Sequence, residues 1–395
     1  MFTYHRQADD LKDQSLIHFS YYRPKEGSFV SPNENAGDTA LHDATRRLFD
    51  HFLGPNRWLI ELLWQPVTTD TIAKVNQTQA AILGGGGLLL RDQKGAEKVA
   101  TGWQWNCSLE QLVKFQVPLL VFAIGYNRFR GQDDFSPIFT KHINSVIEQS
   151  AFFGLRNSGS IRALTPYLTP ANAKKLSLQP CPTTLAWYLY PEIHSGATVA
   201  HDKTMAVNIA LDRTEYRFGS SQDQILNVIA KVLSKYQQQG WSITLANHKP
   251  EDAAFAKFLK HRHLPYTAVN LWESPAQDVF RFYQSQAVSV GMRGHAQMIP
   301  FGLRKRIVSI ISHDKMQWFL EDIGHPEWGA DVRDRGFADQ LDHAIATATS
   351  EHQAANLNKS VIESQEKLWQ LTDNNLSKIQ TLVASTMTKP VSQRG

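Results

Sequence analysis

The sequence predicts an α/β protein with two doubly wound domains and a helical C-terminal tail. Short apolar runs alternate with amphipathic stretches along most of the chain, which is typical of βαβ units with mostly parallel sheets. The alternation breaks at residues 180–191, which are rich in proline and aromatic residues, and then starts again. The length of 395 residues corresponds to two or three ordinary domains.

Five apolar runs in the first half of the chain are expected to be strands. They cover residues 58–64, 80–83, 118–124, 151–155 and 175–178. Helices are expected between these runs, for example over residues 39–52, which follow turn residues at 35–38. Because the loop-like segment at 194–196 follows the proline-rich stretch, we place the first domain, Rossmann-like in its alternation, at residues 1–190.

The same alternation predicts a second Rossmann-like domain at residues 191–335. Strands are expected at residues 205–211, 241–246, 266–270, 287–292 and 306–312. Helices are expected at residues 222–239, 251–262 and 278–285. From residue 336 to 395 the chain is polar and rich in Ala, Gln, Asn and Lys, so we expect a helical tail that packs against the rest of the molecule.

Composition and charge exclude several classes of protein. A hydrophobic content of 42% with 20% charged residues excludes a disordered chain, a collagen-like repeat and a disulfide scaffold. The net charge of +4 predicts no nucleic-acid partner, although it suits a local pocket for a small anion. Cys107 and Cys181 form no metal-binding pattern, so we expect two buried thiols in a reducing compartment and no metal site.

The N-terminal residues have no apolar segment typical of a signal peptide. The longest apolar run, residues 117–126, is shorter than the roughly 20 residues that a membrane span requires. We therefore expect a cytoplasmic protein, and peripheral association with the inner face of the membrane is compatible with this. The sequence leaves the oligomeric state open.

In doubly wound folds, ligands bind beyond the carboxyl ends of the strands, so residues that follow a strand are the candidate site residues. Gly84, Gly85 and Gly86 follow the expected strand 80–83 and are followed by a fourth glycine. Because glycine has no Cβ, the backbone N–H groups of these residues would be accessible to an anion or to a ligand that carries hydroxyl groups. The alternative is that the glycines form a flexible connection between a strand and a helix. The pattern is neither GxGxxG nor a P-loop, which excludes both nucleotide motifs.

Two further strand ends offer polar groups. Asp38, three residues after Asn35, is either the N-cap of the helix at 39–52 or a carboxylate that accepts a proton. Arg156 follows the strand at 151–155, and a helix is expected to open with small polar residues that include Asn157 and Ser160. A guanidinium beside free helix N–H groups would bind phosphate or carboxylate, and a surface ion pair is the alternative for Arg156.

The segment after the strand at 287–292 is the most informative. Arg293 and His295 lie two residues apart where a helix begins, so both side chains can face the same crevice. Histidine is well suited to transfer a proton near neutral pH, although an isolated histidine is more often structural. Lys315 and His248 also follow expected strands, each with a capped helix start as the alternative. The recurrence of cations at this edge indicates an anion site.

Taken together, these motifs resemble the polysaccharide pyruvyl transferase family over about residues 28–325. The matching segments are N-x-G-D at 35–38, the strand and glycines at 83–87, R-x-x-x-S at 156–160, H-x-x-x-D at 248–252 and, most specifically, MRGHAQMIPFG followed by VSIISHDKMQWFLEDIG. Gly294 departs from the pattern, since the family usually has a larger apolar residue there. Residues 1–27 and those beyond about 335 lie outside the resemblance.

The resemblance implies a fold like that of the two-domain glycosyltransferases of the B type, with the active site between the domains. It also implies transfer of a pyruvyl group from phosphoenolpyruvate to two hydroxyls of a sugar, which yields a cyclic ketal and phosphate. No metal or nucleotide cofactor is expected. The acceptor would be a glycan of the bacterial envelope or capsule, or its lipid-linked precursor.

The resemblance also suggests roles for the candidate residues. Arg156, Arg293 and Lys315 would bind the donor anion, together with Asn157 and Ser160. His295, kept charged by the donor, would be the general acid and Asp38 the base. The residues expected on the acceptor side are Asn35, Gly84, Gly85, Gly86 and His248. Two alternatives stay open, namely a B-type glycosyltransferase that uses a nucleotide-sugar and an inactive glycan-binding component of a polysaccharide assembly machine.

Overall fold

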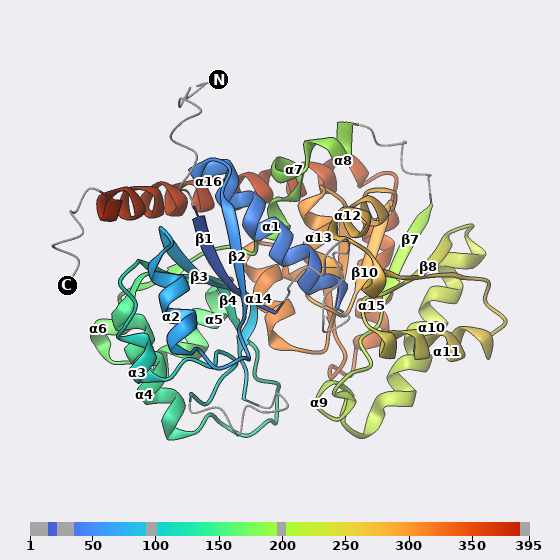
Figure 1. Ribbon diagram of the computed structural model, residues 1–395. Coiled ribbons are helices and arrows are strands. Elements are labelled where there is room, and N and C mark those ends of the chain that lie inside the picture. Colours follow the sequence, from blue (N-terminus) through green and yellow to red (C-terminus); the bar gives the residue numbers. More distant parts are fainter. Residues whose placement is uncertain (1–14, 22–34, 92–100, 196–202, 388–395) are drawn as a thin grey trace.

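The computed structural model describes residues 15–21, 35–91, 101–195 and 203–387 of the chain. These residues form two six-stranded sheets, one in each half of the chain, and every strand pairing is parallel (Figure 1). Because parallel strands need helical crossovers, helices cover both sheets. The predicted fold class, two doubly wound α/β domains, is confirmed.

The first sheet has the strand order β2-β1-β3-β4-β5-β6. Its strands are β1 (Ser15–Ser20), β2 (Arg57–Leu62), β3 (Ala80–Leu89), β4 (Leu119–Tyr126), β5 (Ser150–Leu155) and β6 (Leu176–Leu178). The helices in this half are α1 (Ala36–Leu53), α2 (Thr69–Asn76), α3 (Leu109–Leu112), α4 (Pro137–Gln149), α5 (Ser158–Leu164), α6 (Pro170–Ala173), α7 (Ala186–Leu189) and α8 (Pro191–Ser195).

The second sheet has the order β12-β11-β10-β7-β8-β9. Its strands are β7 (Thr204–Asn208), β8 (Ser242–Asn247), β9 (Thr267–Asn270), β10 (Val288–Gly291), β11 (Arg306–Ile311) and β12 (Gly329–Asp331). The helices are α9 (Thr214–Phe218), α10 (Gln222–Gln238), α11 (Ala256–Lys260), α12 (Ala276–Gln284), α13 (His295–Gly302), α14 (Asp314–Asp322), α15 (Phe337–Thr349) and α16 (Ala354–Met387).

The sequence predicted β2 to β6 and β7 to β11, but it did not predict β1 or β12. β1 lies beside β2 and β3 inside the first sheet, although His18 and Ser20 interrupt its apolar pattern. Both polar side chains are fully buried in the structure. β12 has three residues, which is too short for a periodic pattern.

Several contacts hold the two halves of the molecule against each other. The backbone N–H of Ala36, at the start of α1, donates to the carbonyl of His248 at 3.0 Å. Arg130, after β4, forms ion pairs with Asp314 and Asp331 of the second half. These contacts fix the relative placement of the strand ends that face each other across the two halves.

Helix α16 contacts both halves, as Figure 1 shows by its position along the back of the molecule. Asn375 donates to the carbonyl of Leu178 at 2.8 Å, and Gln365 donates to the carbonyl of Gly302 at 2.6 Å. Leu376 is completely buried in a hydrophobic cluster that includes residues of both halves. The preceding helix α15 packs against β11 and β12, so the segment after residue 336 contributes to the core. Among the described helices, none has both the length and the apolar character of a membrane span.

We expect Leu376→Ala to lower the free energy of unfolding by about 2–5 kcal/mol, because it leaves a cavity under α16. The exposed Lys378 on the same helix provides a matched control, and Lys378→Ala should change stability by less than about 0.5 kcal/mol. Urea denaturation monitored by circular dichroism measures both. Equal stabilities of the two variants would contradict the packing of α16 described here.

Candidate active site

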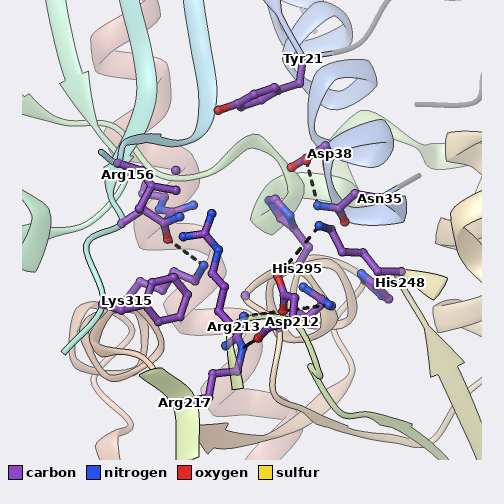
Figure 2. A pocket seen from close by; sticks show the side chains of 17 residues that line it. Tyr21, Asn35, Asp38, Arg156, Asp212, Arg213, Arg217, His248, His295 and Lys315 are labelled. Atoms are coloured by element: carbon purple, nitrogen blue, oxygen red, sulfur yellow. Dashed lines mark hydrogen bonds and ion pairs between the residues drawn. The ribbon is translucent and has the colours of Figure 1, made fainter. Parts of the chain in front are cut away.

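A cavity of about 360 Å³ lies between the two halves, at the carboxyl ends of both sheets (Figure 2). Residues that follow strands of both sheets line it, among them Leu90 after β3, Asn127 after β4, Arg156 after β5, Asp212 after β7, His248 after β8 and Arg293 after β10. The structure brings these predicted site residues to the cavity: Asn35, Asp38, Arg156, His248, Arg293, His295 and Lys315.

Positive charge dominates the wall of this cavity. Among the described lining residues, the cationic side chains are Arg156, Arg213, Arg217, Lys249, Arg293 and Lys315, and the carboxylates are Asp38 and Asp212. Arg213, Arg217 and Lys249 were not predicted as site residues from the sequence. Arg213 and Lys249 lie within three residues of the ends of the expected strands 205–211 and 241–246, which is the criterion that singled out Arg156. Arg217 lies further along the chain, in α9, and had no such signal.

Arg293 is held by two carboxylates. Its Nε donates to Asp252 Oδ2 at 2.8 Å and its Nη2 to Asp252 Oδ1 at 2.6 Å. The same Nη2 lies 3.1 Å from Asp212 Oδ1. Burial favours the neutral form of Asp212, but the fields of Arg293 and Arg217 hold its pKa below the ordinary value. Two of the three nitrogens of Arg293 are therefore already paired with carboxylates.

Arg156 has a different environment. Its side chain is 7% exposed, and its Nε and Nη2 have no hydrogen-bond partner among the described residues. The guanidinium packs against the backbone of Gly125, where a Cβ would lie 2.2 Å from Nε. Burial lowers the pKa of Arg156. A buried guanidinium without a carboxylate partner is an uncompensated positive charge, so Arg156 is suited to an anion in the cavity that it lines.

Lys315 extends from the first turn of α14 towards the same region (Figure 2). Its Nζ donates to Asn127 Oδ1 at 2.9 Å. Burial and the fields of Arg156 and Arg217 lower the pKa of Lys315 well below its ordinary value. Repulsion between these neighbouring cations would be relieved by a bound anion.

His295 is the first residue of α13 and lies against the N-terminus of α1. A Cβ on Gly37 would come within 2.5 Å of His295 Nδ1, so the ring needs a glycine there. On the other side, His295 Nε2 lies 3.8 Å from Cys181 Sγ. Burial, followed by the fields of Arg156, His248 and Lys315, lowers the pKa of His295 well below its ordinary value. The imidazole is therefore neutral when the cavity holds no anion.

Asp38 is in the first turn of α1, but it is not the N-cap. Asn35 caps the helix by accepting a hydrogen bond from the N–H of Gly37 at 3.1 Å, and its Nδ2 donates to Asp38 Oδ2 at 2.8 Å. Burial raises the pKa of Asp38, although Lys249 and Lys315 oppose this. The structure thus leaves the Asp38 carboxyl in the cavity wall, held by Asn35.

The structure does not bring Gly84, Gly85 and Gly86, which were expected on the acceptor side, to the cavity. All three belong to β3, have φ values of 145°, 38° and 100°, and do not line the cavity. A Cβ on Gly84 would lie 2.1 Å from the carbonyl oxygen of Phe122, and one on Gly85 would lie 2.7 Å from Leu41. These glycines allow β3 to bend and to pack closely against β4 and α1.

The expected donor contacts of Asn157 and Ser160 are also corrected. Asn157 is the N-cap of α5 and accepts from the N–H of Ser160 at 2.7 Å. Ser160 Oγ accepts from the N–H of Tyr126 at 3.0 Å. The N–H of Ser158 donates to Asp322 Oδ2 at 2.8 Å, so a carboxylate of α14 already occupies this helix terminus. Neither Asn157 nor Ser160 lines the cavity.

His248 lines the cavity, but its side chain has a structural partner. Its Nε2 lies 2.6 Å from the hydroxyl of Tyr283, and burial lowers its pKa to about 3. Its carbonyl accepts the bond from Ala36 described above. His248 therefore joins the two halves at the edge of the cavity. Within the described parts of the chain, no group of three or more His, Cys, Asp or Glu side chains is arranged to hold a metal ion.

Comparison with known proteins gives a family and a fold. The profile of the family described as polysaccharide pyruvyl transferase matches residues 35–314, well over half of the chain. Among solved structures, UDP-GlcNAc 2-epimerase from Neisseria meningitidis bound to UDP-GlcNAc matches with a TM-score of 0.51 and 8% identity, over 93% of this chain and 100% of that one. UDP-N-acetylglucosamine 2-epimerase from Rickettsia bellii matches with a TM-score of 0.52 and 10% identity, over 94% of this chain and 97% of that one. At these identities the likeness shows the fold alone. No curated protein matches the chain.

We expect the protein to lose stability on acidification below about pH 6.5. Burial lowers the folded-state pKa of six histidines: His18, His42, His142, His248, His295 and His313. Below the unfolded-state pKa, histidines of the unfolded chain are protonated while these folded histidines stay neutral. The free energy of unfolding therefore falls by about 1.4 kcal/mol per histidine for each pH unit. Among the described carboxyl groups, only Asp38 and Asp322 have raised pKa values that oppose the trend. Urea unfolding at pH 7.5, 6.5 and 5.5 tests this, and a constant stability would contradict it.

We also expect inorganic phosphate to raise the melting temperature, because it supplies oxygens to Arg156 and Lys315. Arg156→Gln should lose most of this gain. The exposed Arg57 on β2 is the matched control, and Arg57→Gln should respond to phosphate like the wild type. Chloride at equal ionic strength separates specific binding from screening. An equal phosphate response in both variants would rule out Arg156 as an anion ligand.

Proposed function

The chain belongs to the polysaccharide pyruvyl transferase family, and we propose that it transfers the pyruvyl group of phosphoenolpyruvate to two hydroxyls of a sugar. The acceptor would be a bacterial envelope or capsular glycan or its lipid-linked precursor. The observation that best supports this donor is the buried guanidinium of Arg156, which has no carboxylate partner among the described residues, beside Lys315 and a neutral His295. Phosphoenolpyruvate has a carboxylate and a phosphate that would compensate this positive charge.

The cations divide into two groups with different roles. Arg156 and Lys315 would bind the donor directly, because no carboxylate among the described residues pairs with either in the structure. Arg293 would act on the donor mainly through its charge, because Asp252 and Asp212 engage its Nε and Nη2. All three charges remain in the cavity wall, where the low dielectric strengthens their attraction for an anion.

His295 would donate the first proton, to the methylene carbon of the donor, which creates a methyl group and an oxocarbenium-like centre. A sugar hydroxyl attacks this centre, the phosphate leaves, and a second hydroxyl closes the cyclic ketal. Two hydroxyl protons are released. One replaces the proton that His295 gave, and the other leaves with the phosphate, so the reaction is balanced without an oxidant, a reductant or a metal ion.

Donor binding would itself charge His295. In the empty cavity burial and the fields of Arg156, His248 and Lys315 keep the pKa of this ring low. The negative charges of phosphoenolpyruvate offset these positive fields and raise the pKa, so binding takes up a proton. Donor affinity should therefore increase as the pH falls from the pKa of His295 in the bound state towards its lower pKa in the empty cavity.

Asp38 would accept the proton of the attacking hydroxyl. Its carboxyl lines the cavity beside His295 (Figure 2), and burial raises its pKa, which makes it a stronger base than an exposed aspartate. The hydrogen bond from Asn35 holds one of its oxygens in place. The rest of the cavity, bounded by Tyr21 and Phe129, would accommodate the sugar.

We expect the protein to release phosphate from phosphoenolpyruvate only when a saccharide acceptor is present, and the product to gain a pyruvyl ketal detectable by mass spectrometry. His295→Gln should lower kcat by about 10²–10⁴-fold, because it removes the acid, while phosphoenolpyruvate still binds. The exposed His261 provides the control, and His261→Gln should behave like the wild type. Thermal shift with each ligand measures binding independently of turnover.

Two outcomes would contradict this function. A thermal shift with a nucleotide-sugar and none with phosphoenolpyruvate would identify a B-type glycosyltransferase. A shift with glycans alone would identify an inactive binding component. Near-normal turnover of His295→Gln would leave the pyruvyl transfer in place but remove His295 as its acid.

A further inference from the structure

The ring of His295 has different surroundings at its two nitrogens. Nε2 points to the wall, where Cys181 Sγ lies 3.8 Å away. Nδ1 lies on the side of Gly37, where a Cβ would come within 2.5 Å of it, and has no hydrogen-bond partner among the described residues. Because Nδ1 is not among their fully buried unpaired atoms, it keeps access from the cavity that His295 lines. In Figure 2 the ring lies beside Asn35, the N-cap of α1, and Asp38 in the first turn of that helix.

Cys181 is itself held in a fixed place. It is 2% exposed, immediately precedes the 3₁₀ turn Pro182–Leu185, and its Sγ lies 3.2 Å from Thr183 Oγ1. The turn is tied to other elements, since the carbonyl of Thr184 accepts from Gln365 of α16 at 3.1 Å. The sulfur atom is therefore a rigid partner for the histidine.

From these contacts we propose that Cys181 is a positioning residue that accepts the Nε2–H of His295, so that Nδ1 is the nitrogen that gives and recovers the catalytic proton. The inference rests on the proposed function for its catalytic part, while the orientation of the ring stands on the geometry alone. The proton leaves Nδ1 for the donor carbon and is replaced by a hydroxyl proton, and Nε2 keeps its hydrogen throughout.

A thiol suits this place for a chemical reason. Burial raises the pKa of Cys181, so the group stays a neutral thiol. A neutral sulfur is a weak acceptor that orients the ring without adding a negative charge. A carboxylate in its place would stabilise the imidazolium and make it a poorer acid. The thiol therefore fixes the tautomer and leaves the acidity of His295 to the bound donor.

The other titratable groups around the ring set the background for any pH effect. They are Arg156 after β5, His248 after β8, Lys315 of α14, and His42 and Asp38 of α1. The arginine, the lysine and the two histidines disfavour the imidazolium in the empty cavity. Because none of them changes when Cys181 is replaced, a shift of the pH profile in a Cys181 variant reports on the Cys181–His295 contact.

The test compares three variants. Cys181→Ala should lower kcat about 10-fold to 100-fold and shift the alkaline limb of its pH profile, where the general acid loses its proton, with the Kd for phosphoenolpyruvate within about twofold of the wild type. Cys181→Ser should recover most of the rate, because a hydroxyl also accepts from Nε2. Cys107 is the other cysteine of the chain and is fully buried, so Cys107→Ala is the matched control and should leave kcat and the pH profile unchanged.

A second measurement does not depend on activity. Nitrogen-15 spectra of histidine-labelled protein, assigned with His295→Gln, should show the Nε2–H tautomer for His295 in the wild type and a mixture of tautomers in Cys181→Ala. The inference is overturned if His295 carries its hydrogen on Nδ1, or if Cys181→Ala keeps both the wild-type tautomer and the wild-type pH profile. Absence of turnover in the wild type would instead be a failure of the proposed function, and the spectra would still decide the orientation.

Discussion

The candidate site depends on one buried ionic contact, the pairing of Arg293 with Asp252 and Asp212. Arg293 follows β10, Asp252 follows β8, and Asp212 follows β7, so the three charges join the ends of three neighbouring strands. Asn208 completes the junction, because it accepts from the N–H of Arg293 at 3.0 Å and donates to Asp252 at 3.1 Å. Loss of one partner from a buried pair leaves an uncompensated charge, at a cost of about 3–5 kcal/mol. This junction directs the start of α13 and therefore the position of His295.

The same junction explains why some cations in the cavity wall have no carboxylate partner. Asp252 and Asp212 form ion pairs with Arg293, and Asp212 also forms one with Arg217. Arg156, which is buried, and Lys315, which is half-buried, are then left without a carboxylate partner among the described residues. A protein that only had to be stable would pair or expose such groups. Here both cations already lie at the cavity in the unliganded protein. They can therefore stabilise a charged ligand or transition state with little rearrangement of the protein.

The amino-acid sequence by itself determined the architecture and the general place of the site. Apolar runs spaced by amphipathic stretches are a local property, and they predicted ten of the twelve strands that the structure describes, as well as the parallel α/β fold. Parallel strands bring their carboxyl ends to one edge, so Arg156, His295 and Lys315 could be placed at a shared crevice from their positions after strands. The motifs also predicted the family, because they are short stretches of consecutive residues.

Only the tertiary structure decided which polar group serves which purpose. Asn157 and Ser160 satisfy the start of α5, and Gly84 and Gly85 let β3 pack closely on its neighbours, although their sequence pattern suits a ligand equally well. The contact of Cys181 with His295 joins residues 114 positions apart, so no local sequence pattern predicts it. Hydrogen bonds and ion pairs form between whichever groups packing brings within about 3 Å. The sequence determines which polar residue follows each strand. Which groups these residues contact follows from the three-dimensional packing of both halves.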